Sequence, residues 1–465
     1  MEILRRAPML GIFAALASGA TMFDRMGALS FAVMMPAVYA AVMFCSYEED
    51  LPEQWSVFAA GLVICAVCSV RMYYVFTRPA PQNITLTQES GTVQTVRTWG
   101  RTYAIVIDAD NGQRYVTNRP FADFMLGDRI VFDGVTRSFR PRYADSSFDE
   151  GRFWGARGVS SWISIYNVEE LPARFSLPRM RTIISRKLTM YMPDGVAAYL
   201  KAAWIGERDE LFTRMHRRWG TVHLLAVSGF HVGIVILCAS MIFGKRTLIL
   251  SVILWAYVLL TGAAPSALRA GLMIQTGLIS RALGRGVSGV NAVSVAGVSI
   301  LMYSPLMFWD LGFRLSVLAA LVISTFPHEK YMWLVMSPVI SLATFPQVSY
   351  VFGEIVLVGL LLNIIAPAYY AAAITVTSGF GILRLLNVPL MNYMMFACEG
   401  IFLIWERTAD FFAELIPYSV GWNWITAWIG SGTMMFCVCR YFGFAPMRTA
   451  AVMAAGSFLA FVMFL

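Results

Sequence analysis

Long runs of hydrophobic residues, broken by short polar segments, make up most of this chain. Examples are Met26–Phe44, Trp55–Phe76 and Ile355–Ile382. A helix needs about 20 residues to cross the ~30 Å hydrocarbon core of a bilayer, so these runs predict transmembrane helices. The composition agrees, because 58% of the 465 residues are hydrophobic and only 14% are charged, whereas roughly one quarter of a soluble protein is charged. The pattern predicts a polytopic α-helical membrane protein and excludes a soluble enzyme, a disordered tail and a disulfide-stapled secreted module.

The predicted spans form two groups. The N-terminal group, within residues 1–79, consists of Pro8–Phe23, Met26–Phe44 and Trp55–Phe76. The C-terminal group, within residues 221–465, consists of His223–Phe243, Thr247–Thr261, Pro265–Ser280, Asn291–Tyr303, Leu311–Phe326, Tyr331–Phe345, Ile355–Gly379, Pro389–Trp405, Trp424–Val438 and Ala450–Leu465. Several of these later spans are short or interrupted by Gly, Pro or Ser. Broken helices are tolerated at membrane depth only where they face protein or a water-filled cavity, which favours a pore or transporter over a simple anchor.

Residues 80–171 have the texture of a small β domain. Five short stretches rich in Val, Ile, Thr and Tyr are separated by turn signals, and they are Asn83–Thr87, Thr92–Trp99, Tyr103–Asp108, Gln113–Thr117 and Asp128–Phe132. Such spacing predicts a small antiparallel barrel inserted between the two groups of spans, and the oligonucleotide-binding (OB) fold is a natural candidate. With Arg5 and Arg6 on the inner side, three spans would deliver this domain to the outer face of the membrane.

The net charge of +8 is unevenly distributed. Residues 1–79 and 80–171 each carry a net charge of −1, residues 172–220 carry +6, and residues 221–465 carry +4. The slightly acidic barrel argues against a strong electrostatic DNA platform. The 172–220 connector includes a basic amphipathic helix over Leu177–Tyr191, which is typical of the membrane interface. The interfacial arginines predicted in the connector are Arg179, Arg181, Arg186, Arg217 and Arg218.

Two histidines and a serine interrupt one apolar run, at His223, Ser228 and His231. On a continuous helix, two residues eight apart lie about 80° around the axis, so the histidines would share one broad face that the serine does not quite join. Hydrogen-bonded packing between helices is the alternative interpretation. Neither a hydrolase nor a metal site is expected, because the histidines lack an orienting acid and lack carboxylate or cysteine partners.

Other polar groups stand at membrane depth farther along the chain. Arg269 lies one turn inside the helix that opens at Pro265, where a buried cation is costly and therefore a functional candidate. Asp310 and Arg314 are spaced i, i+4 and can form an internal ion pair. Asn363 lies four residues before a helix-breaking proline. No cofactor motif and no nucleoside-triphosphate motif occurs, so neither a cofactor nor an enzymatic activity is predicted.

These motifs resemble the ComEC family of competence proteins, the membrane channels that pass single-stranded DNA into transformable bacteria. The string His223–Val232 matches the family's HLLAxSGxHV signature with its spacing intact. The elements similar to other family segments, in chain order, are Ser147–Gly158, Ala203–Leu211, Gly262–Ala270, Trp309–Ala320 and Phe352–Pro367. The likeness covers roughly residues 20–420 and keeps the family's order.

The resemblance implies a multi-pass protein of the cytoplasmic (inner) membrane, with an OB-like domain over residues 80–171 and a competence-type channel domain that encloses the DNA path. The residues that fall on or beside the motif positions, and are therefore DNA-path candidates, are His223, Ser228, His231, Arg269, Asp310, Arg314 and Asn363. Arg314 departs from the family, which often has Gln there. Many relatives also carry a C-terminal metallo-β-lactamase-like domain, whereas this chain ends in an apolar run, so we expect a form without that nuclease.

The predicted function is therefore an inner-membrane channel that imports single-stranded DNA during natural transformation. Its expected partners are single-stranded DNA, the lipid bilayer, and a separate DNA receptor, helicase-like motor and nuclease. Two alternatives remain open at this stage. One is a transporter of another anionic substrate on the same fold. The other is a membrane scaffold whose near-neutral barrel binds protein.

Overall fold

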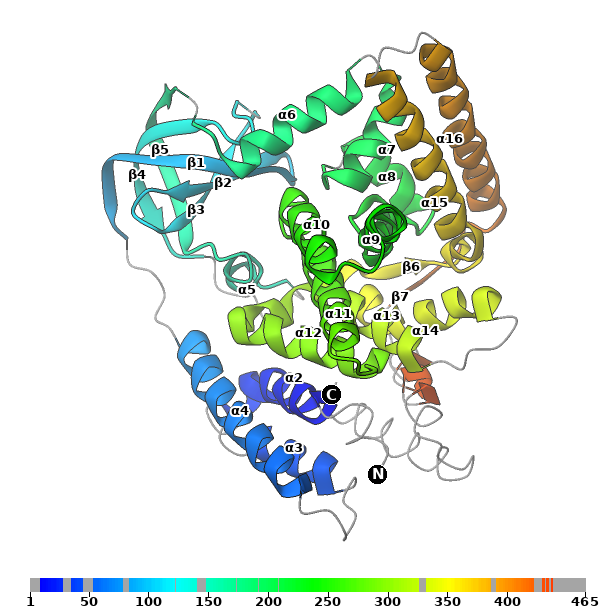
Figure 1. The fold of residues 1–465 in the computed structure, drawn as a ribbon. Helices are drawn as coiled ribbons and strands as arrows, with labels where there is room; N and C mark the ends of the chain where they lie inside the picture. The colour runs from blue at the N-terminus through cyan, green and yellow to red at the C-terminus, as the bar shows by residue number, and fades with distance from the viewer. Residues whose placement is uncertain are drawn as a thin grey trace.

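The computed structural model describes most of the chain as helices, with a small β domain on one side of the helical body (Figure 1). The described residues are 9–27, 35–44, 53–77, 83–121, 123–139, 148–172, 174–190, 192–207, 209–325, 332–385, 390–421, 429–430, 432–434 and 436–437. The predicted span Ala450–Leu465 lies outside them, as does most of Trp424–Val438.

Five strands close into a barrel in the order β1-β2-β3-β5-β4. They are β1 (Thr85–Trp99), β2 (Thr102–Ala109), β3 (Arg114–Arg119), β4 (Arg129–Arg137) and β5 (Ser161–Leu171). All pairs are antiparallel except β3 with β5. Residues of β4 alternate between buried and partly buried, as expected for a strand with one face on a core. That core includes Ile105, Ile107, Ile130 and Phe132.

Two details of the strand prediction are wrong. The first two predicted strands are one long strand, β1, whose register shifts beside Leu86 and again after Val93. A bulge bends a strand without ending it, so the polar residues between the two apolar stretches did not mark a turn. The fifth strand is Ser161–Leu171, which the sequence analysis did not identify. It is preceded by a short helix, α5 (Glu150–Gly155), which connects it to the rest of the domain.

The N-terminal helices are α2 (Met9–Met26), α3 (Met35–Phe44) and α4 (Glu53–Phe76). They pack together and against the C-terminal half, in a core that includes Leu16, Met35, Tyr39 and Val293. Cys65 and Cys68 are buried in this core as free thiols.

The connector folds into three helices, α6 (Leu177–Thr189), α7 (Asp194–Trp204) and α8 (Glu210–Arg218). Helix α6 reaches from the barrel towards α7 and α15 (Figure 1). Its N-terminus is capped by Ser176, whose hydroxyl accepts from the N–H of Arg179. Side-chain oxygens of serine satisfy the first free N–H groups of a helix, which explains why α6 begins there.

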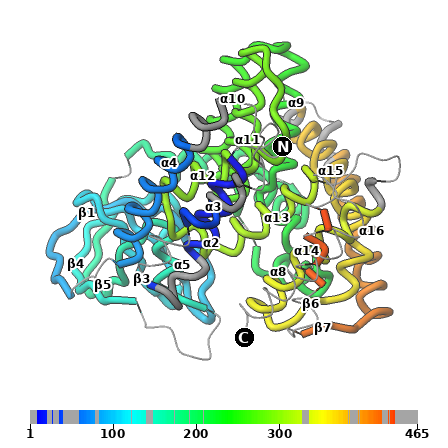
Figure 2. Tube along the Cα trace, turned by 90° about the horizontal axis from the view of Figure 1, so that it is seen from below, coloured from blue at the N-terminus to red at the C-terminus, as the bar shows by residue number. Residues whose placement is uncertain are grey.

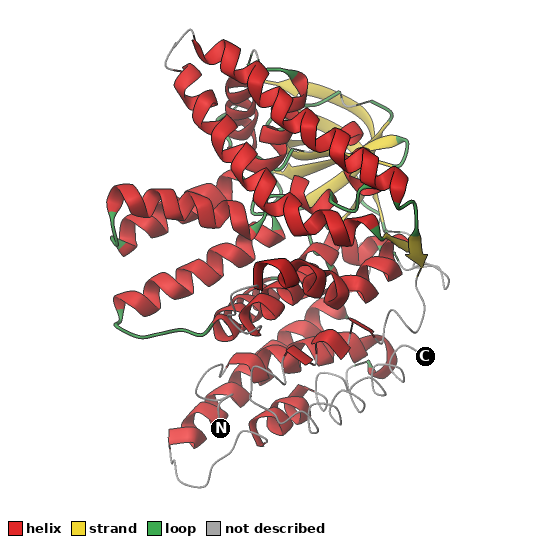
Figure 3. Ribbon diagram, turned by 90° about the vertical axis from the view of Figure 1, so that its right-hand side faces the viewer, coloured by secondary structure: helices red, strands yellow, loops and turns green. Residues whose placement is uncertain are grey.

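The remaining elements carry the membrane motifs. In chain order they are η2 (Val222–Leu225), α9 (Gly229–Phe243), α10 (Thr247–Leu260), α11 (Pro265–Ala282), α12 (Gly289–Tyr303), η3 (Pro305–Trp309), α13 (Leu311–Thr325), α14 (Met332–Phe352), β6 (Glu354–Val356), α15 (Val358–Leu385), α16 (Leu390–Leu415) and β7 (Ser419–Gly421). In Figure 2 the barrel lies on one side of the molecule and α15 with α16 on the other, with α11, α12 and α13 between them. Figure 3 shows the strands of the barrel gathered at one end of the helical body.

Three segments of the described helices are long and apolar enough to cross a membrane, namely Ala59–Phe76, Val335–Phe352 and Val358–Gly381. Five further apolar stretches are shorter, and they lie in α2, α9, α10, α12 and α13. This mostly helical architecture fits a membrane protein. The prediction that proline interrupts the spans is wrong for two of the long helices, since α14 continues through Pro338 and Pro346 and α15 continues through Pro367.

Candidate functional site

Residues 223–231, which contain both histidines and are called the histidine segment below, do not form one continuous helix. The 3₁₀ helix η2 contains His223, the chain is extended at Ser228 (φ −107°, ψ 164°), and α9 begins only at Gly229. The prediction that His223 and His231 share one helix face is therefore wrong. The reason is local, because serine is a preferred residue at a helix N-cap and glycine weakens a helix interior. The helix accordingly begins at the Ser228–Gly229 step instead of running through it.

Ser228 and His231 are direct partners at this helix start. The backbone N–H of Ser228 donates to Nδ1 of His231 at 3.1 Å, and the Ser228 hydroxyl lies 3.1 Å from the same nitrogen. The arrangement is a capping box in which histidine stands where Glu or Gln is usual. His231 is 8% exposed, whereas His223 is exposed. The structure thus brings Ser228 and His231 together and places His223 apart from them.

Arg269 lies close to the same helix start. Helices α9 and α11 are tied there by Ser266, whose hydroxyl donates to the carbonyl of Val227 at 2.5 Å. One turn into α11, Arg269 is 9% exposed. Its Nε donates to Ser316 Oγ on α13 at 2.5 Å, and its Nη1 contacts Met273 Sδ at 3.1 Å. The prediction of a buried cation inside this helix is confirmed. Arg269 makes no ion pair with a carboxylate within the part of the chain that the structure describes.

Asp310 does not form the ion pair with Arg314 that their i, i+4 spacing allows. It precedes α13, and its Oδ1 accepts from the N–H of Phe313 at 3.0 Å. Its Oδ2 instead pairs with Nη2 of Arg157 at 2.7 Å. The i, i+4 rule applies to two residues inside one helix, whereas a capping residue turns its carboxylate back over the first turn. Arg314 is left with an Nε that is buried and has no hydrogen-bond partner among the described residues.

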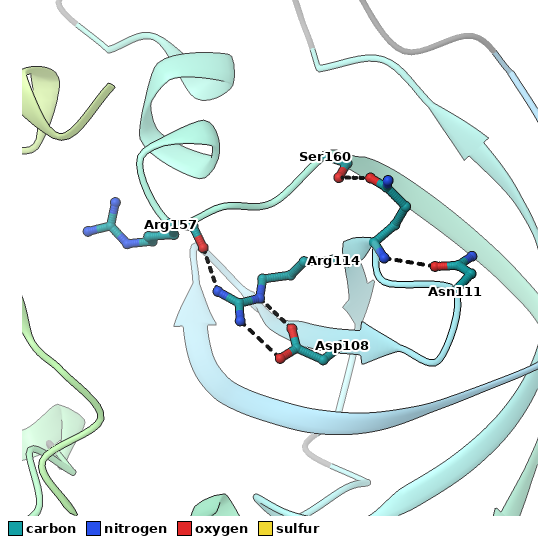
Figure 4. Close-up of polar contacts among 6 residues, drawn as sticks. Asp108, Asn111, Arg114, Arg157 and Ser160 are labelled. Atoms are coloured by element: carbon teal, nitrogen blue, oxygen red, sulfur yellow. Dashed lines mark hydrogen bonds and ion pairs between the residues drawn. The ribbon is translucent and has the colours of Figure 1, made fainter. Parts of the chain in front are cut away.

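Arg157 reaches Asp310 from the segment between α5 and β5. Its carbonyl oxygen accepts from Nη1 of Arg114 at 2.7 Å, and Arg114 is itself held by both carboxylate oxygens of Asp108 (Figure 4). Hydrogen bonding to Asp108 raises the pKa of Arg114. The Arg157 side chain points away from this network (Figure 4). The barrel strands therefore fix the backbone from which Arg157 crosses to the membrane helices.

A second contact lies beside this ion pair. The guanidinium of Arg152, on α5, lies 4.0 Å from the ring centroid of Trp309. Asp310 follows Trp309 directly, so two arginines from the barrel side meet consecutive residues at the start of α13. No sequence pattern assigns a role to Arg152 or Arg157. Their presence in the Ser147–Gly158 segment, which carries part of the family resemblance, was the available signal.

Asn363 lies at the beginning of the histidine segment. Its Nδ2 donates to the carbonyl of Gly220 at 3.3 Å, while its Oδ1 is buried and has no partner among the described residues. Helix α15 and the chain before η2 cross at two glycines, since a Cβ on Gly220 would lie 2.9 Å from Cα of Gly359. Asn363 is thus close to the histidine segment but at its opposite end from Arg269.

Most of the predicted interfacial arginines contact protein. Nη2 of Arg181 donates to the Ile205 carbonyl at 2.8 Å. Burial lowers the pKa of Arg181, and the nearby Glu207 carboxylate opposes only part of this shift. On the barrel side, Arg179 lies 3.9 Å from Asp128 and Arg186 contacts Met125 Sδ. On the α16 side, Arg218 lies 3.7 Å from Asp410 and 3.5 Å from Glu414. Arg217 is exposed. The connector therefore docks onto the barrel and α16 as well as presenting a basic surface.

One buried polar cluster was missed by the sequence analysis. His216 is fully buried on α8, and its Nε2 lies 3.3 Å from the Tyr199 hydroxyl and 3.2 Å from the Tyr370 hydroxyl. Tyr199 also donates to Glu406 Oε1 at 2.9 Å, and the Thr221 hydroxyl lies 2.9 Å from His216 Nδ1. Burial lowers the pKa of His216 to about 4. The cluster draws on α7, α8, α15 and α16, so no local sequence pattern could have revealed it.

Comparisons with known proteins find similarity to one described family and to a curated protein. A family model described as Competence protein matches residues 204–446, a range that contains all seven DNA-path candidates. The chain is 28% identical over 265 residues to ComE operon protein 3 of Bacillus subtilis (strain 168). That match covers 52% of this chain and 34% of the relative, so the chain spans about a third of the length of the curated relative it matches. No solved structure matches the chain.

Proposed function

Because the chain belongs to the competence protein family, with a role in DNA uptake for competence, we propose that it forms the channel through which single-stranded DNA enters the cell. This deepens the family assignment, which the sequence motifs had predicted and the comparisons confirm. We place the channel in the cytoplasmic membrane as a multi-pass protein, with the barrel on the outer face. The strand order β1-β2-β3-β5-β4 of that closed barrel supports an OB-like domain.

The observation that carries the proposal is the buried arginine at the meeting point of three helices. Arg269 on α11 lies beside the start of α9 and is bonded to α13, and no carboxylate among the described residues neutralises it. Placing a cation at membrane depth is costly, so its retention needs an anionic partner. A single strand of DNA carries one negative charge per nucleotide and supplies such a partner repeatedly as it passes.

Passage requires contacts that are numerous and individually weak, because a strand that is bound tightly at one point stops moving. Aromatic side chains along the path can add base stacking of about 1–3 kcal/mol each. We assign the chain a passive, non-enzymatic role. The driving force, the capture of DNA at the surface and the degradation of the other strand then fall to a separate motor, receptor and nuclease.

The test is a deletion of the gene, followed by an uptake assay with DNA labelled on one strand. Without the channel, label should bind to the cell surface but fail to enter the nuclease-protected interior, and the intact gene should restore entry. The matched control is a complementing gene with the exposed Arg281 changed to Gln, which should restore entry fully. Unchanged entry of label in the deletion strain would contradict the proposal and favour transport of another anionic substrate.

A further inference from the structure

Helices α9 and α11 begin side by side, and both beginnings are electropositive. The Ser266–Val227 hydrogen bond holds the second residue of α11 against the segment that leads into α9. In α9, a helix of 15 residues, the N–H groups of Gly229 and Phe230 have no acceptor within the described residues. Unpaired N–H groups give a helix N-terminus roughly half a positive charge.

Arg269 adds a full charge to the same place. It is 9% exposed, and its Nε and Nη1 are engaged by Ser316 and Met273. Its Nη2 has no hydrogen-bond partner among the described residues, and it lies 3.5 Å from the point where a Cβ on Gly229 would be. The free donor of a nine-tenths buried side chain is thus directed at the N-terminus of α9.

Gly229 makes this approach possible. A Cβ at this position would lie 3.3 Å from Cβ of Ala270 and would stand between the first turn of α9 and the guanidinium. With glycine, the helix N–H groups and Nη2 of Arg269 lie close together with no side chain separating them. Like charges brought together without an internal counter-ion are destabilising, so the site is completed only by an external anion.

We propose that the N-terminus of α9 and Arg269 bind a backbone phosphodiester of single-stranded DNA. The inference rests on the proposed channel function and names the chemical group that the channel recognises. Helix N–H groups and a guanidinium are the donors that phosphate oxygens take in proteins. A phosphodiester carries one negative charge, which matches the single guanidinium. Because every nucleotide offers the same group, the site accepts any sequence.

Binding of oligothymidylate to the full chain in detergent tests the proposal. Loss of a charged hydrogen bond should weaken binding about ten- to hundredfold in Arg269→Gln. Arg281→Gln is the matched control, because Arg281 is an exposed arginine at the C-terminal end of the same helix, and it should bind as the native chain does. Gly229→Ala should also weaken binding, although it changes no charge.

A second ligand separates backbone recognition from base recognition. An oligothymidylate with neutral methylphosphonate linkages should bind the native chain and Arg269→Gln equally weakly. If the two proteins still differ for this neutral oligonucleotide, the site does not read phosphate and the proposal fails. Arg269→Lys keeps the charge and should bind within a few-fold of the native chain, which keeps the test valid if Arg269→Gln does not fold.

Oligonucleotide binding tests the phosphodiester site, whereas DNA entry in the deletion strain tests the channel function, so the two can fail independently. Native-like oligonucleotide binding by Arg269→Gln overturns the phosphodiester site, even if deletion of the gene abolishes DNA entry. Weakened binding by Arg269→Gln supports the site, even if deletion leaves DNA entry unchanged and the channel function is rejected.

Discussion

Arg157 and Asp310 are separated by 153 residues in the chain, and their side chains meet at 2.7 Å between Nη2 and Oδ2. The pair joins the segment that is anchored to the barrel by Arg114 to the residue that caps α13. Helix α13 carries both Arg314 and Ser316, and Ser316 is the partner of Arg269. The position of the barrel and the position of the buried arginines are therefore mechanically linked.

Breaking this pair should destabilise the protein. Asp310 is 5% exposed while Arg157 is partly exposed, so Arg157→Met would leave a buried carboxylate without its cation. Removing one partner of a fully buried ion pair lowers the free energy of unfolding by about 3–5 kcal/mol. Because Arg157 is partly exposed, we expect a loss of about 3 kcal/mol or less. A double-mutant cycle with Asp310→Asn, measured by unfolding in detergent, should give a coupling energy of about 1–3 kcal/mol.

Arg314 supplies the control for that cycle. Because Asp310 is engaged by Arg157 and by the first turn of α13, its coupling to Arg314 should be clearly smaller. The Asp310→Asn and Arg314→Gln cycle is expected to give a smaller coupling energy than the Arg157 cycle, because Asp310 acts on Arg314 through space without a hydrogen bond or ion pair between them. A large coupling for Asp310–Arg314 and none for Asp310–Arg157 would show that the ion pair has been assigned to the wrong arginine.

The crossing of Gly220 and Gly359 predicts a second effect. Gly220 has φ +69°, and a Cβ there would lie 2.9 Å from Cα of Gly359. Gly220→Ala should therefore suffer from backbone strain and from a collision with backbone that cannot move away. Backbone strain and the collision should each cost about 1–3 kcal/mol, so we expect the free energy of unfolding to fall by about 2 kcal/mol or more in total.

A second glycine separates these two sources. Gly284 has φ +67° but no atom within 4 Å of its Cβ position, so Gly284→Ala measures the strain alone. Gly220→Ala should be the more destabilising of the two in thermal unfolding, by the energy of the collision. Equal losses would mean that α15 does not pack against the histidine segment at these glycines.

The sequence was informative where structure depends on neighbouring residues, and misleading where it depends on distant ones. Hydrophobic runs predicted the membrane helices, and the stretches rich in Val and Ile predicted most of the barrel strands. Arg269 could be identified because a lone arginine after Pro265 in an apolar run has few interpretations. The spacing of Asp310 and Arg314 indicates a local ion pair, whereas the actual partner, Arg157, lies 153 residues away and only the folded chain brings it near. Tyr199, His216 and Glu406 escaped notice for the same reason.

The loop before α11 predicts a stabilising substitution. Ala263 has φ +51°, a conformation that side chains other than glycine rarely adopt. Replacing it by glycine should relieve about 1–2 kcal/mol of backbone strain in the folded state. The greater conformational freedom of glycine in the unfolded chain offsets roughly 0.5–1 kcal/mol of this gain. The thermal unfolding temperature of Ala263→Gly should accordingly be equal to or slightly above that of the native chain. A clear decrease would contradict the left-handed geometry at this residue.

The buried His216 predicts that the protein is less stable in acid. Burial in the folded state lowers the pKa of His216 from 6.5 to about 4, and the Thr221 carbonyl opposes part of this shift. The other polar neighbours of the ring are the Tyr199, Tyr370 and Thr221 hydroxyls and His223. Glu406 is reached through Tyr199. Between these two pKa values His216 is largely protonated in the unfolded state and largely neutral in the folded state. The stabilisation is therefore complete above about pH 6.5 and is lost progressively as the pH falls towards 4, by up to roughly 3 kcal/mol.

Unfolding of the full chain in detergent, measured between pH 7.5 and pH 4.5, checks this effect. Changing His216 to Gln removes the titrating group while keeping a side chain that can hydrogen-bond, so the variant should show a smaller loss of stability over this range. His328 lies outside the described residues and serves as the matched substitution, because His328→Gln should leave the native pH dependence in place if the effect arises at His216. Identical pH dependence in the native chain and in His216→Gln would exclude His216 as its source. The native chain would lose stability over this range because α8, α15 and α16 close around a neutral imidazole, and protonation would place a charge there that only hydroxyl groups and the Thr221 carbonyl contact through hydrogen bonds.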